Sequence, residues 1–296
     1  MHVGEKIKRL RTAKLMTQSE LVGGEITRNM LSRIENGAAQ PSMATIKYIA
    51  ARLNVSPGFL LAEEDDEILY FKSVEIGNIK KAYINKDYSL CRDMCLNSEW
   101  RDDELFLILA ESTLYVGIEV FSHGNLHKAS ELFDEAMEYC SSTIYNTDVI
   151  RAQAKSYFGY MGYISPMLDS NYSDDSEGNM ISFLGDAFSV YSNSFLIGET
   201  QGYKNIPYLE ERLSLISKGS SYEMHIRAKL FMEENNYAEG YAILHELLLS
   251  DSYEMPEPML YFIFGDLEVC CKEIDDFKGA YDFSKSKIDL MQKLLG

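Results

Sequence analysis

The chain has 296 residues, of which 46% are hydrophobic and 25% charged, and this is long enough for two globular domains. Its longest apolar runs, 105–110 and 259–264, fall short of the roughly 20 residues that a membrane-spanning helix needs. The N-terminus is basic but lacks the apolar stretch of a signal peptide, so we expect a cytoplasmic protein without a membrane partner.

Charge is unevenly distributed along the chain. The formal net charge is −18, from 28 Lys and Arg against 46 Asp and Glu. Residues 1–62 hold nine Lys or Arg and four Asp or Glu, a net +5, which leaves −23 for the remainder. Because phosphate repels an acidic surface, only the first part can lie along DNA. The acidic part either attracts a basic ligand and limits non-specific DNA binding, or is an ordinary solvated surface.

Two short helices are predicted first. Thr17 and Glu20 form a capping box that begins the second helix, and Gly23-Gly24 ends it. Lysines and arginines occupy the other faces of the first helix. That first helix is indicated by apolar residues at helical spacing, namely Val3, Ile7, Leu10 and Ala13.

A third helix is predicted between Thr27, which can cap it, and Gly37, which ends it. Leu31 and Ile34 point into a core. The opposite face carries side chains suited to base edges and phosphates, and these are Arg28, Asn29, Ser32, Arg33 and Asn36.

Two more helices complete this part of the chain. Ser42 can cap a helix, and Ser56-Pro57 begins another with proline at its first position. The predicted buried residues of the two helices are Ile46, Ile49, Ala50 and Leu53, then Phe59, Leu60 and Leu61.

Two short helices separated by glycine are typical of a helix-turn-helix. Arg28, Asn29 and Arg33 should then face the major groove, with Ser32 contacting either a base or a phosphate and Asn36 a phosphate. Gln18, at the start of the second helix, can reach a phosphate. Glu35 is expected to form a structural ion pair with Arg11. The DNA-binding candidates are therefore Gln18, Thr27, Arg28, Asn29, Ser32, Arg33 and Asn36; the alternative for the two arginines is a solvated surface.

Residues 4–62 resemble the XRE (Cro/repressor-type) helix-turn-helix domain. The resemblance implies a five-helix, λ-repressor-like domain that binds double-stranded DNA. The turn 23–25 is one residue shorter than the family pattern, so we expect the third helix at a slightly different angle. The matching segments are 7–11 (Ile-Lys-Arg-Leu-Arg), 16–18 (Met-Thr-Gln), 31–37 (Leu-Ser-Arg-Ile-Glu-Asn-Gly), Pro41-Ser42, Ile49-Ala50, Leu53 and Val55-Ser56.

Beyond this domain the pattern stays helical. An acidic run, 63–67, suggests a linker and the start of the next helix, and we place boundaries at 1–62, 63–72 and 73–296. Six prolines in the whole chain and few strand signals predict an all-α fold.

One sequence motif occurs four times in the acidic part. It consists of a polar residue, a large apolar residue directly after it, a small residue three positions later, and an apolar residue three positions after that. It begins at 87, 125, 236 and 276. The first two starts are 38 residues apart and the last two 40, and the 111 residues between 125 and 236 leave room for three units of 37. The motif resembles a divergent tetratricopeptide repeat, which implies an α-solenoid. Two degenerate units are expected at 151–218, with a long loop at 169–179.

Stacked helix pairs can present a concave face to a ligand. Most of the 20 Tyr and 14 Phe are expected to be packing residues. Candidates for a ligand contact are Tyr157, Tyr160, Asn193 and Asn235, together with Phe158 and Tyr163.

The positions of the cysteines and histidines do not indicate a metal or redox site. Cys91 and Cys95, Cys140, and Cys270-Cys271 are expected to be buried small hydrophobic residues. His123 and His127 have helical ligand spacing, but Gly124-Asn125 between them indicates a turn. No cofactor or metal is predicted.

An XRE-type domain followed by tetratricopeptide-like repeats in just under 300 residues resembles the RRNPP family of peptide-sensing regulators. The resemblance implies a homodimer on a pseudo-palindromic operator, controlled by a short peptide. The alternative is a DNA-bound adaptor whose repeats recruit a protein without a small ligand. An enzyme is disfavoured, because the chain has no phosphate-binding glycine loop, nucleophile elbow or metal cluster.

Overall fold

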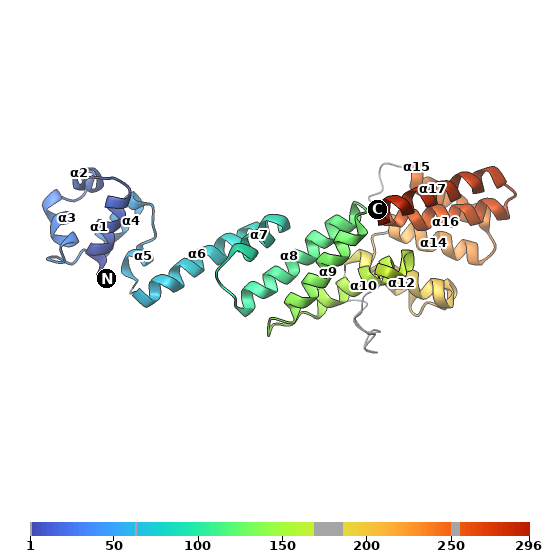
Figure 1. Ribbon diagram of the computed structural model, residues 1–296, viewed down its shortest axis with the longest axis horizontal. Coiled ribbons are helices and arrows are strands. Elements are labelled where there is room, and N and C mark those ends of the chain that lie inside the picture. The colour runs from blue at the N-terminus through green and yellow to red at the C-terminus, as the bar shows by residue number, and fades with distance from the viewer. Residues whose placement is uncertain (1, 63, 169–185, 250–254) are drawn as a thin grey trace. The chain divides into compact units, whose positions relative to one another are not determined.

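The computed structural model describes residues 2–62, 64–168, 186–249 and 255–296, and in these the secondary structure is helical apart from one isolated bridge (Figure 1). The all-α prediction is thereby confirmed. The chain divides into two compact units, Met1–Lys81 and Ala82–Gly296. The division lies inside a continuous helix, α6 (Glu64–Ile84), so it falls later in the chain than the boundaries expected from composition.

Unit 1 contains the five expected helices and most of α6. Thr17, Thr27, Ser42 and Ser56 each accept a backbone N–H bond at a helix start, as their positions predict. The five helices are α1 (Val3–Ala13), α2 (Gln18–Val22), α3 (Arg28–Glu35), α4 (Met43–Leu53) and α5 (Pro57–Leu61).

The core of unit 1 is the predicted one with two exceptions. Leu61 is 45% exposed and Ala13 is exposed, because each lies at the C-terminal end of its helix. Lys6 is fully buried instead of solvated. Its ammonium group donates to the carbonyl oxygens of Ala62, at 2.5 Å, and Phe59, at 3.4 Å, so it satisfies acceptors at the end of α5. Buried core residues are Ile7, Leu21, Leu31, Ile34, Ile46, Ile49, Ala50, Leu53, Phe59 and Leu60.

Unit 2 is built from successive helix pairs (Figure 1). Its helices are α7 (Tyr88–Asn97), α8 (Asp103–Ser122), α9 (Leu126–Cys140), α10 (Asp148–Ile164), α12 (Ala187–Gln201), α13 (Leu209–Ser214), α14 (Ser221–Glu233), α15 (Tyr237–Leu249), α16 (Glu257–Glu273) and α17 (Phe277–Leu295), with 3-10 turns η1 (Pro166–Leu168) and η2 (Tyr203–Asn205).

The four repeat motifs share one turn. In each, the residue before the motif has a left-handed backbone: Lys86, Gly124, Asn235 and Asp275 have φ of 60°, 82°, 59° and 63°. In three of them the next polar residue then caps the following helix: Asp87, Asn125 and Asp276. The small residue of each motif is buried at the helix contact, and these are Cys91, Ala129, Gly240 and Ala280. The range 151–218, where two degenerate units were expected, holds most of α10 and all of α12, η2 and α13, while the loop expected at 169–179 lies outside the described residues.

Elements from both ends of unit 2 meet. α8 contacts α16, and α9 contacts α17. A Cβ on Gly124, in the turn between α8 and α9, would lie 2.3 Å from a Glu257 carboxylate oxygen and 2.9 Å from Leu294. One hydrophobic cluster extends from Ala110 to Leu294 through this contact. The helix pairs therefore surround a filled core.

α8 is the described helix that is long and apolar enough to cross a membrane by length and composition. Its apolar run 105–110 ends at Glu111, and the polar or small residues Ser112, Thr113 and Gly117 follow, so no single run in the helix is as long as a membrane span. These three residues are buried in unit 2, and a Cβ on Gly117 would lie 2.7 Å from the Phe133 ring. α8 therefore packs as a core helix between α7 and α9.

Candidate nucleic-acid interface

The turn between α2 and α3 depends on two glycines. Gly23 and Gly24 have φ of 53° and 104°, which L side chains rarely adopt. A Cβ on Gly23 would also lie 2.5 Å from the Tyr48 hydroxyl and 2.7 Å from an Arg52 nitrogen. These two side chains come from α4. Tyr48 donates to Val22 O at 2.9 Å and Arg52 to Glu20 O at 2.5 Å, so α4 holds the end of α2 in place.

α3 presents the expected polar face. Leu31 and Ile34 are 0% and 1% exposed, and both pack in the core. Thr27 caps the helix by accepting from Met30 N at 3.1 Å. Ser32 is half-buried. The exposed members of the candidate set are Thr27, Arg28, Asn29, Arg33 and Asn36.

One exposed residue of this face was missed from the sequence. Met30 is 37% exposed, beside Asn29 and one turn before Arg33. The sequence did offer a signal, because Met30 does not lie on the face of the helix that Leu31 and Ile34 turn toward the core. An exposed thioether beside polar groups is suited to the methyl group of thymine.

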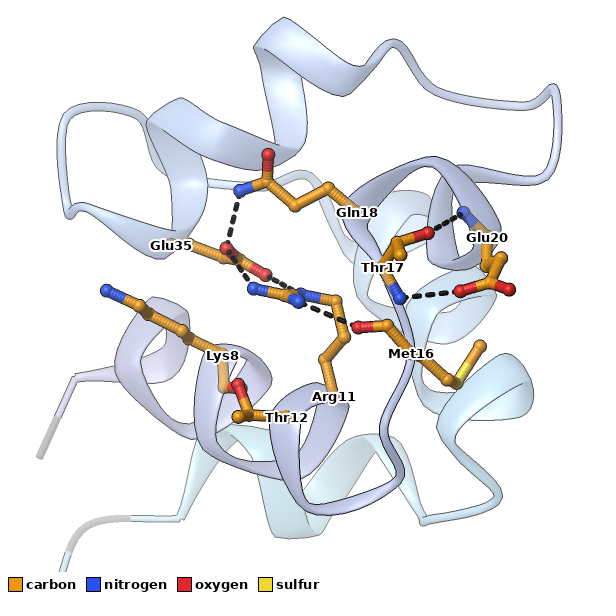
Figure 2. A network of polar contacts seen from close by, with 8 residues as sticks. All are labelled: Lys8, Arg11, Thr12, Met16, Thr17, Gln18, Glu20 and Glu35. Carbon is orange, nitrogen blue, oxygen red and sulfur yellow. Dashed lines mark hydrogen bonds and ion pairs between the residues drawn. The ribbon is translucent and has the colours of Figure 1, made fainter.

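Glu35 joins three helices through one carboxylate (Figure 2). Its side chain is 2% exposed, and Oε1 accepts from Arg11 Nε at 2.7 Å while Oε2 accepts from Arg11 Nη2 at 3.1 Å. Arg11 also donates to Met16 O at 2.8 Å. The hydrogen bond from Glu35 raises the pKa of Arg11. The predicted structural ion pair is therefore confirmed, and Arg11 is held inside unit 1.

Gln18 also belongs to this cluster. It opens α2 and is half-buried, and its Nε2 donates to Glu35 Oε2 at 2.7 Å. The sequence prediction gave Gln18 a phosphate contact and did not include this bond. Only the tertiary fold brings residues 18 and 35 together.

α1 approaches α3 very closely. A Cβ on Gly4 would lie 1.8 Å from Ile34 O, so no larger residue fits between the two helices. His2 caps α1 by accepting from Gly4 N at 3.1 Å. The end of α3 is thus held by the start of α1 as well as by Arg11.

The candidate ligand residues of unit 2 are placed differently. Tyr157 and Tyr160 are 2% and 0% exposed, so neither faces an open surface in this structure. The reason is the filled core: Phe121, Phe188 and Phe262 pack around their rings. The sequence did not indicate which face of the helix pairs these residues occupy, and the structure places both tyrosines in the core between the helices.

The other candidates occupy three kinds of position. Asn193 is half-buried and donates to Ser189 O at 2.9 Å and Ser156 Oγ at 3.2 Å. Asn235 is exposed and forms the left-handed turn between α14 and α15. Phe158 is buried, whereas Tyr163 is 45% exposed.

A buried polar chain crosses this core and was not predicted. Tyr160 and Tyr191 share a hydroxyl contact of 3.1 Å, Tyr191 reaches His225 Nδ1 at 2.7 Å, and His225 Nε2 reaches Asp266 at 2.8 Å. Lys229 then pairs with Asp266 and Glu199, each at 2.7 Å. Its members come from four helices that are far apart in the sequence, so the sequence gives no signal for such a chain.

Opposing effects act on the charged members of this chain. Burial acts to raise the pKa of Asp266, but the charge of Lys229 and the His225 hydrogen bond outweigh it and leave that pKa below its usual range. Burial acts to lower the pKa of Lys229, and Asp266 and Glu199 outweigh it. Asp266 and Lys229 are therefore ionised partners inside the core.

The described residues contain no group of three or more His, Cys, Asp and Glu side chains that could hold a metal ion. All five cysteines are free and buried, as predicted. His123 follows the end of α8 and Gly124 forms the turn into α9, which confirms the turn predicted there.

Comparison with known proteins agrees with the geometry of unit 1. Residues 7–60 match the family model described as helix-turn-helix, HTH_3. Curated protein sequences give no match. The glycine turn between α2 and α3, the capped α3 and this match together define residues 7–60 as a helix-turn-helix domain. The match covers residues 7–60 only, so it assigns this segment, and not the rest of the chain, to the helix-turn-helix class.

Solved structures give alignments over nearly the whole chain at low identity. PlcR of Bacillus thuringiensis, in complex with the peptide PapR7 and DNA, is 14% identical with a TM-score of 0.23, covering 98% of this chain and 95% of that chain. The apo competence regulator ComR of Streptococcus vestibularis is 16% identical with a TM-score of 0.26, covering 99% and 98%. ComR of Streptococcus suis is 16% identical with a TM-score of 0.20, covering 98% and 96%. Scores at this level do not correspond to a superimposable fold, so no contact is transferred from these structures.

Proposed function

We propose that the chain is a sequence-specific transcription regulator that binds a pseudo-palindromic operator as a homodimer through α3. The observation that carries this proposal is the exposed row of Arg28, Asn29, Arg33 and Asn36 on a helix whose other face is packed into the core. Arginine pairs with guanine and asparagine with adenine in the major groove. Gln18, Thr27 and Ser32 complete the proposed interface.

Selection of duplexes from a random pool by the full-length protein tests this proposal. Enrichment of one inverted-repeat sequence supports it. Binding should also weaken steeply as salt rises, because each neutralised phosphate releases counterions. Equal retention of all duplexes at low salt would contradict sequence-specific recognition, and no retention would contradict DNA binding itself.

We further propose that unit 2 carries the dimer contact and responds to a short peptide. The support is the arrangement along the chain, a helix-turn-helix domain followed by repeated helix pairs that share one turn. Because Tyr157 and Tyr160 are packed in the core, a ligand contact at these residues requires the helix pairs around them to move apart. Asn193 and Asn235 remain weaker candidates for that contact.

A thermal-shift screen of the full-length protein against fractionated peptides of culture medium tests the ligand. A peptide that binds only the folded state raises the melting temperature. If no peptide shifts it while a protein partner co-purifies with the DNA-bound chain, the repeats serve as an adaptor. Charge favours a basic peptide, because the part after residue 62 carries a net −23.

A further inference from the structure

α17 carries an apolar stripe that no described element covers. Phe277, Tyr281 and Ile288 are 69%, 69% and 52% exposed. Their spacing places them on one face of the helix, within about 40° of each other. Another face of α17 packs along α16, where the ring of Phe283 stacks on Phe264 (Figure 1). One exposed apolar residue needs no explanation, whereas three in line on a charged helix indicate a surface that another molecule covers.

A row of charges runs beside this stripe, and its sign alternates. The row consists of exposed residues at intervals of four, three and four, namely Lys278, Asp282, Lys285 and Asp289. None of the four forms an ion pair within the described part of the chain. Charges that flank an apolar stripe select the partner and the orientation when two helices pair, because each charge then meets one of the partner.

The overall charge favours α17 as the place where two copies of the chain can touch. The part after residue 62 carries a net −23, so two such parts repel each other. α17 (Phe277–Leu295) differs from the rest of this part, because its four lysines outweigh its two aspartates and give a net +2. A contact between two copies therefore meets least repulsion at this helix.

The stripe is complementary to itself when two α17 helices run antiparallel. In a two-fold contact, if one residue meets a second residue of the other copy, the second also meets the first. With the axis beside Ser284, Tyr281 packs on Ile288 of the second copy, and Ile288 packs on Tyr281. The small side chain of Ser284 then lies at the centre, where two helices approach most closely.

The charges agree with the same arrangement. Lys278 meets Asp289 of the second copy, and Asp282 meets Lys285. Both charge pairs are centred between residues 283 and 284, and the apolar pair between 284 and 285, a difference of about 1.5 Å along the helix. In a parallel pair the two rows would lie on opposite sides of the contact and would not meet. Charge complementarity therefore selects the antiparallel orientation.

We infer that α17 is the surface through which two copies of the chain associate, as an antiparallel helix pair centred near Ser284. The inference rests on the proposed homodimer and names the contact that holds it. Phe277 and Tyr281 of each copy cover about 150–250 Å² apiece when buried. With their neighbours they approach about 1,000 Å², the lower limit for a specific interface. The dimer is thus weak in solution, and DNA strengthens it by holding two copies together.

Charge reversal tests the pairing. Lys278→Glu sets a carboxylate against Asp289 at both ends of the contact, because the two-fold axis repeats each pair. Sedimentation equilibrium of the full-length protein, alone and with the selected duplex, measures the dissociation constant of the dimer. We expect this constant to rise about ten- to thirtyfold. Adding Asp289→Lys to the same chain restores opposite charges and should return the constant to within about threefold of the wild type.

Two further variants are controls for charge and for the apolar stripe. Lys155→Glu adds the same negative charge at an exposed lysine of α10 and should leave the constant unchanged. Tyr281→Asp buries a carboxylate against Ile288 and should weaken association by about tenfold or more. Its control is Tyr145→Asp, at a half-exposed tyrosine between α9 and α10, which should have no effect. Thermal melts verify that each variant is folded.

Each outcome decides a different point. If Lys278→Glu and Tyr281→Asp associate as the wild type does, the copies meet elsewhere and the inference is wrong, although the homodimer stands. If the double variant associates no better than Lys278→Glu, the antiparallel pairing is overturned. An equal loss in Lys155→Glu shows that only total charge matters, which also overturns it. A wild type that stays monomeric alone and on the duplex contradicts the proposed homodimer itself, and this is seen before any variant is made.

Discussion

Five of the nine basic residues of 1–62 fall into two groups at the residue scale. Lys6, Arg11 and Arg52 donate to carbonyl or carboxylate oxygens inside unit 1, so their charge stabilises the fold. Arg28 and Arg33 are exposed on α3 and form no hydrogen bond or ion pair within the described residues. A charge count alone cannot separate the two groups, whereas the contacts do.

Arg33→Ala should cost about 1–3 kcal/mol on the selected site and flatten the preference at one base pair, because a bidentate contact to guanine is lost. Fluorescence anisotropy on the selected site and its base replacements measures this. Lys47→Ala is the charge control, since it removes one exposed cation from α4 and should weaken all duplexes alike. A uniform loss for Arg33→Ala as well would make Arg33 a phosphate contact.

At the element scale, the position of α3 depends on how closely α1 can approach it. Gly4→Ala places a methyl group 1.8 Å from Ile34 O, so α1 must move away from α3. Overpacking of this kind costs about 1–3 kcal/mol of unfolding free energy. We expect a loss near the larger value, because the new methyl group clashes with a backbone oxygen. Urea unfolding of unit 1 measures the loss.

Gly58→Ala is the matched control, in a helical glycine of the same unit. Its new Cβ would lie 3.6 Å from Ser56 Oγ, an ordinary contact. Alanine should then stabilise unit 1 by about 0.5–1 kcal/mol through its better helix propensity. Equal effects of the two substitutions would show that close contact between α1 and α3 does not matter.

The buried chain in unit 2 gives a second element-scale prediction. Asp266→Asn leaves Lys229 in the core with one carboxylate, Glu199, instead of two. Loss of a buried ionic partner is strongly destabilising, and with Glu199 retained we expect about 2–3 kcal/mol. Glu268→Gln, in the same helix, breaks a surface pair with Lys272 and should change stability by less than about 0.5 kcal/mol. Chemical unfolding followed by tyrosine fluorescence distinguishes them.

The same residue predicts a pH dependence. The pKa of Asp266 is lower in the folded protein than in the unfolded chain, where it is about 3.9. Its contribution is therefore fully present well above that value and is lost as pH falls through the folded pKa. The difference in unfolding free energy between wild type and Asp266→Asn should be constant from about pH 7 to 5 and shrink below. A difference that grows on acidification would contradict the lowered pKa.

Features that depend on residues close together in the chain could be predicted from the sequence, whereas contacts between distant residues could not. Thr17 and Glu20 are three residues apart, so their capping box can be recognised without knowing the fold. The burial of Tyr160 depends on Tyr191 and Phe262, which lie on other helices. In the same way, the hydrogen bond between Gln18 and Glu35 joins residues that only the tertiary fold brings together. The exposed polar face of α3 was predicted, while the hydrogen bond from Gln18 to Glu35 and the filled core of unit 2 were not.

At the scale of the whole molecule, residues 1–62 and the rest of the chain differ in charge and therefore in what they can contact. The basic part matches DNA, and the acidic remainder is repelled by it, so a dimer contact in the acidic part would leave the duplex free for the two helix-turn-helix domains. One such domain makes few base contacts, and tight recognition then requires two on one duplex. The distance between half-sites becomes a property of the assembly rather than of either domain.

Changing that distance tests the assembly directly. Two copies of α3 on one face of DNA should recognise half-sites about 34–36 Å apart, one helical turn. Inserting five base pairs at the centre of the selected site rotates one half-site to the opposite face, and affinity should fall by about 100-fold or more as the advantage of bivalent binding is lost. Inserting ten base pairs restores the face and should recover part of the affinity, to the extent that unit 2 can span the longer distance. A protein that binds as a monomer would be indifferent to both insertions, and light scattering of the complex would then give one chain per duplex.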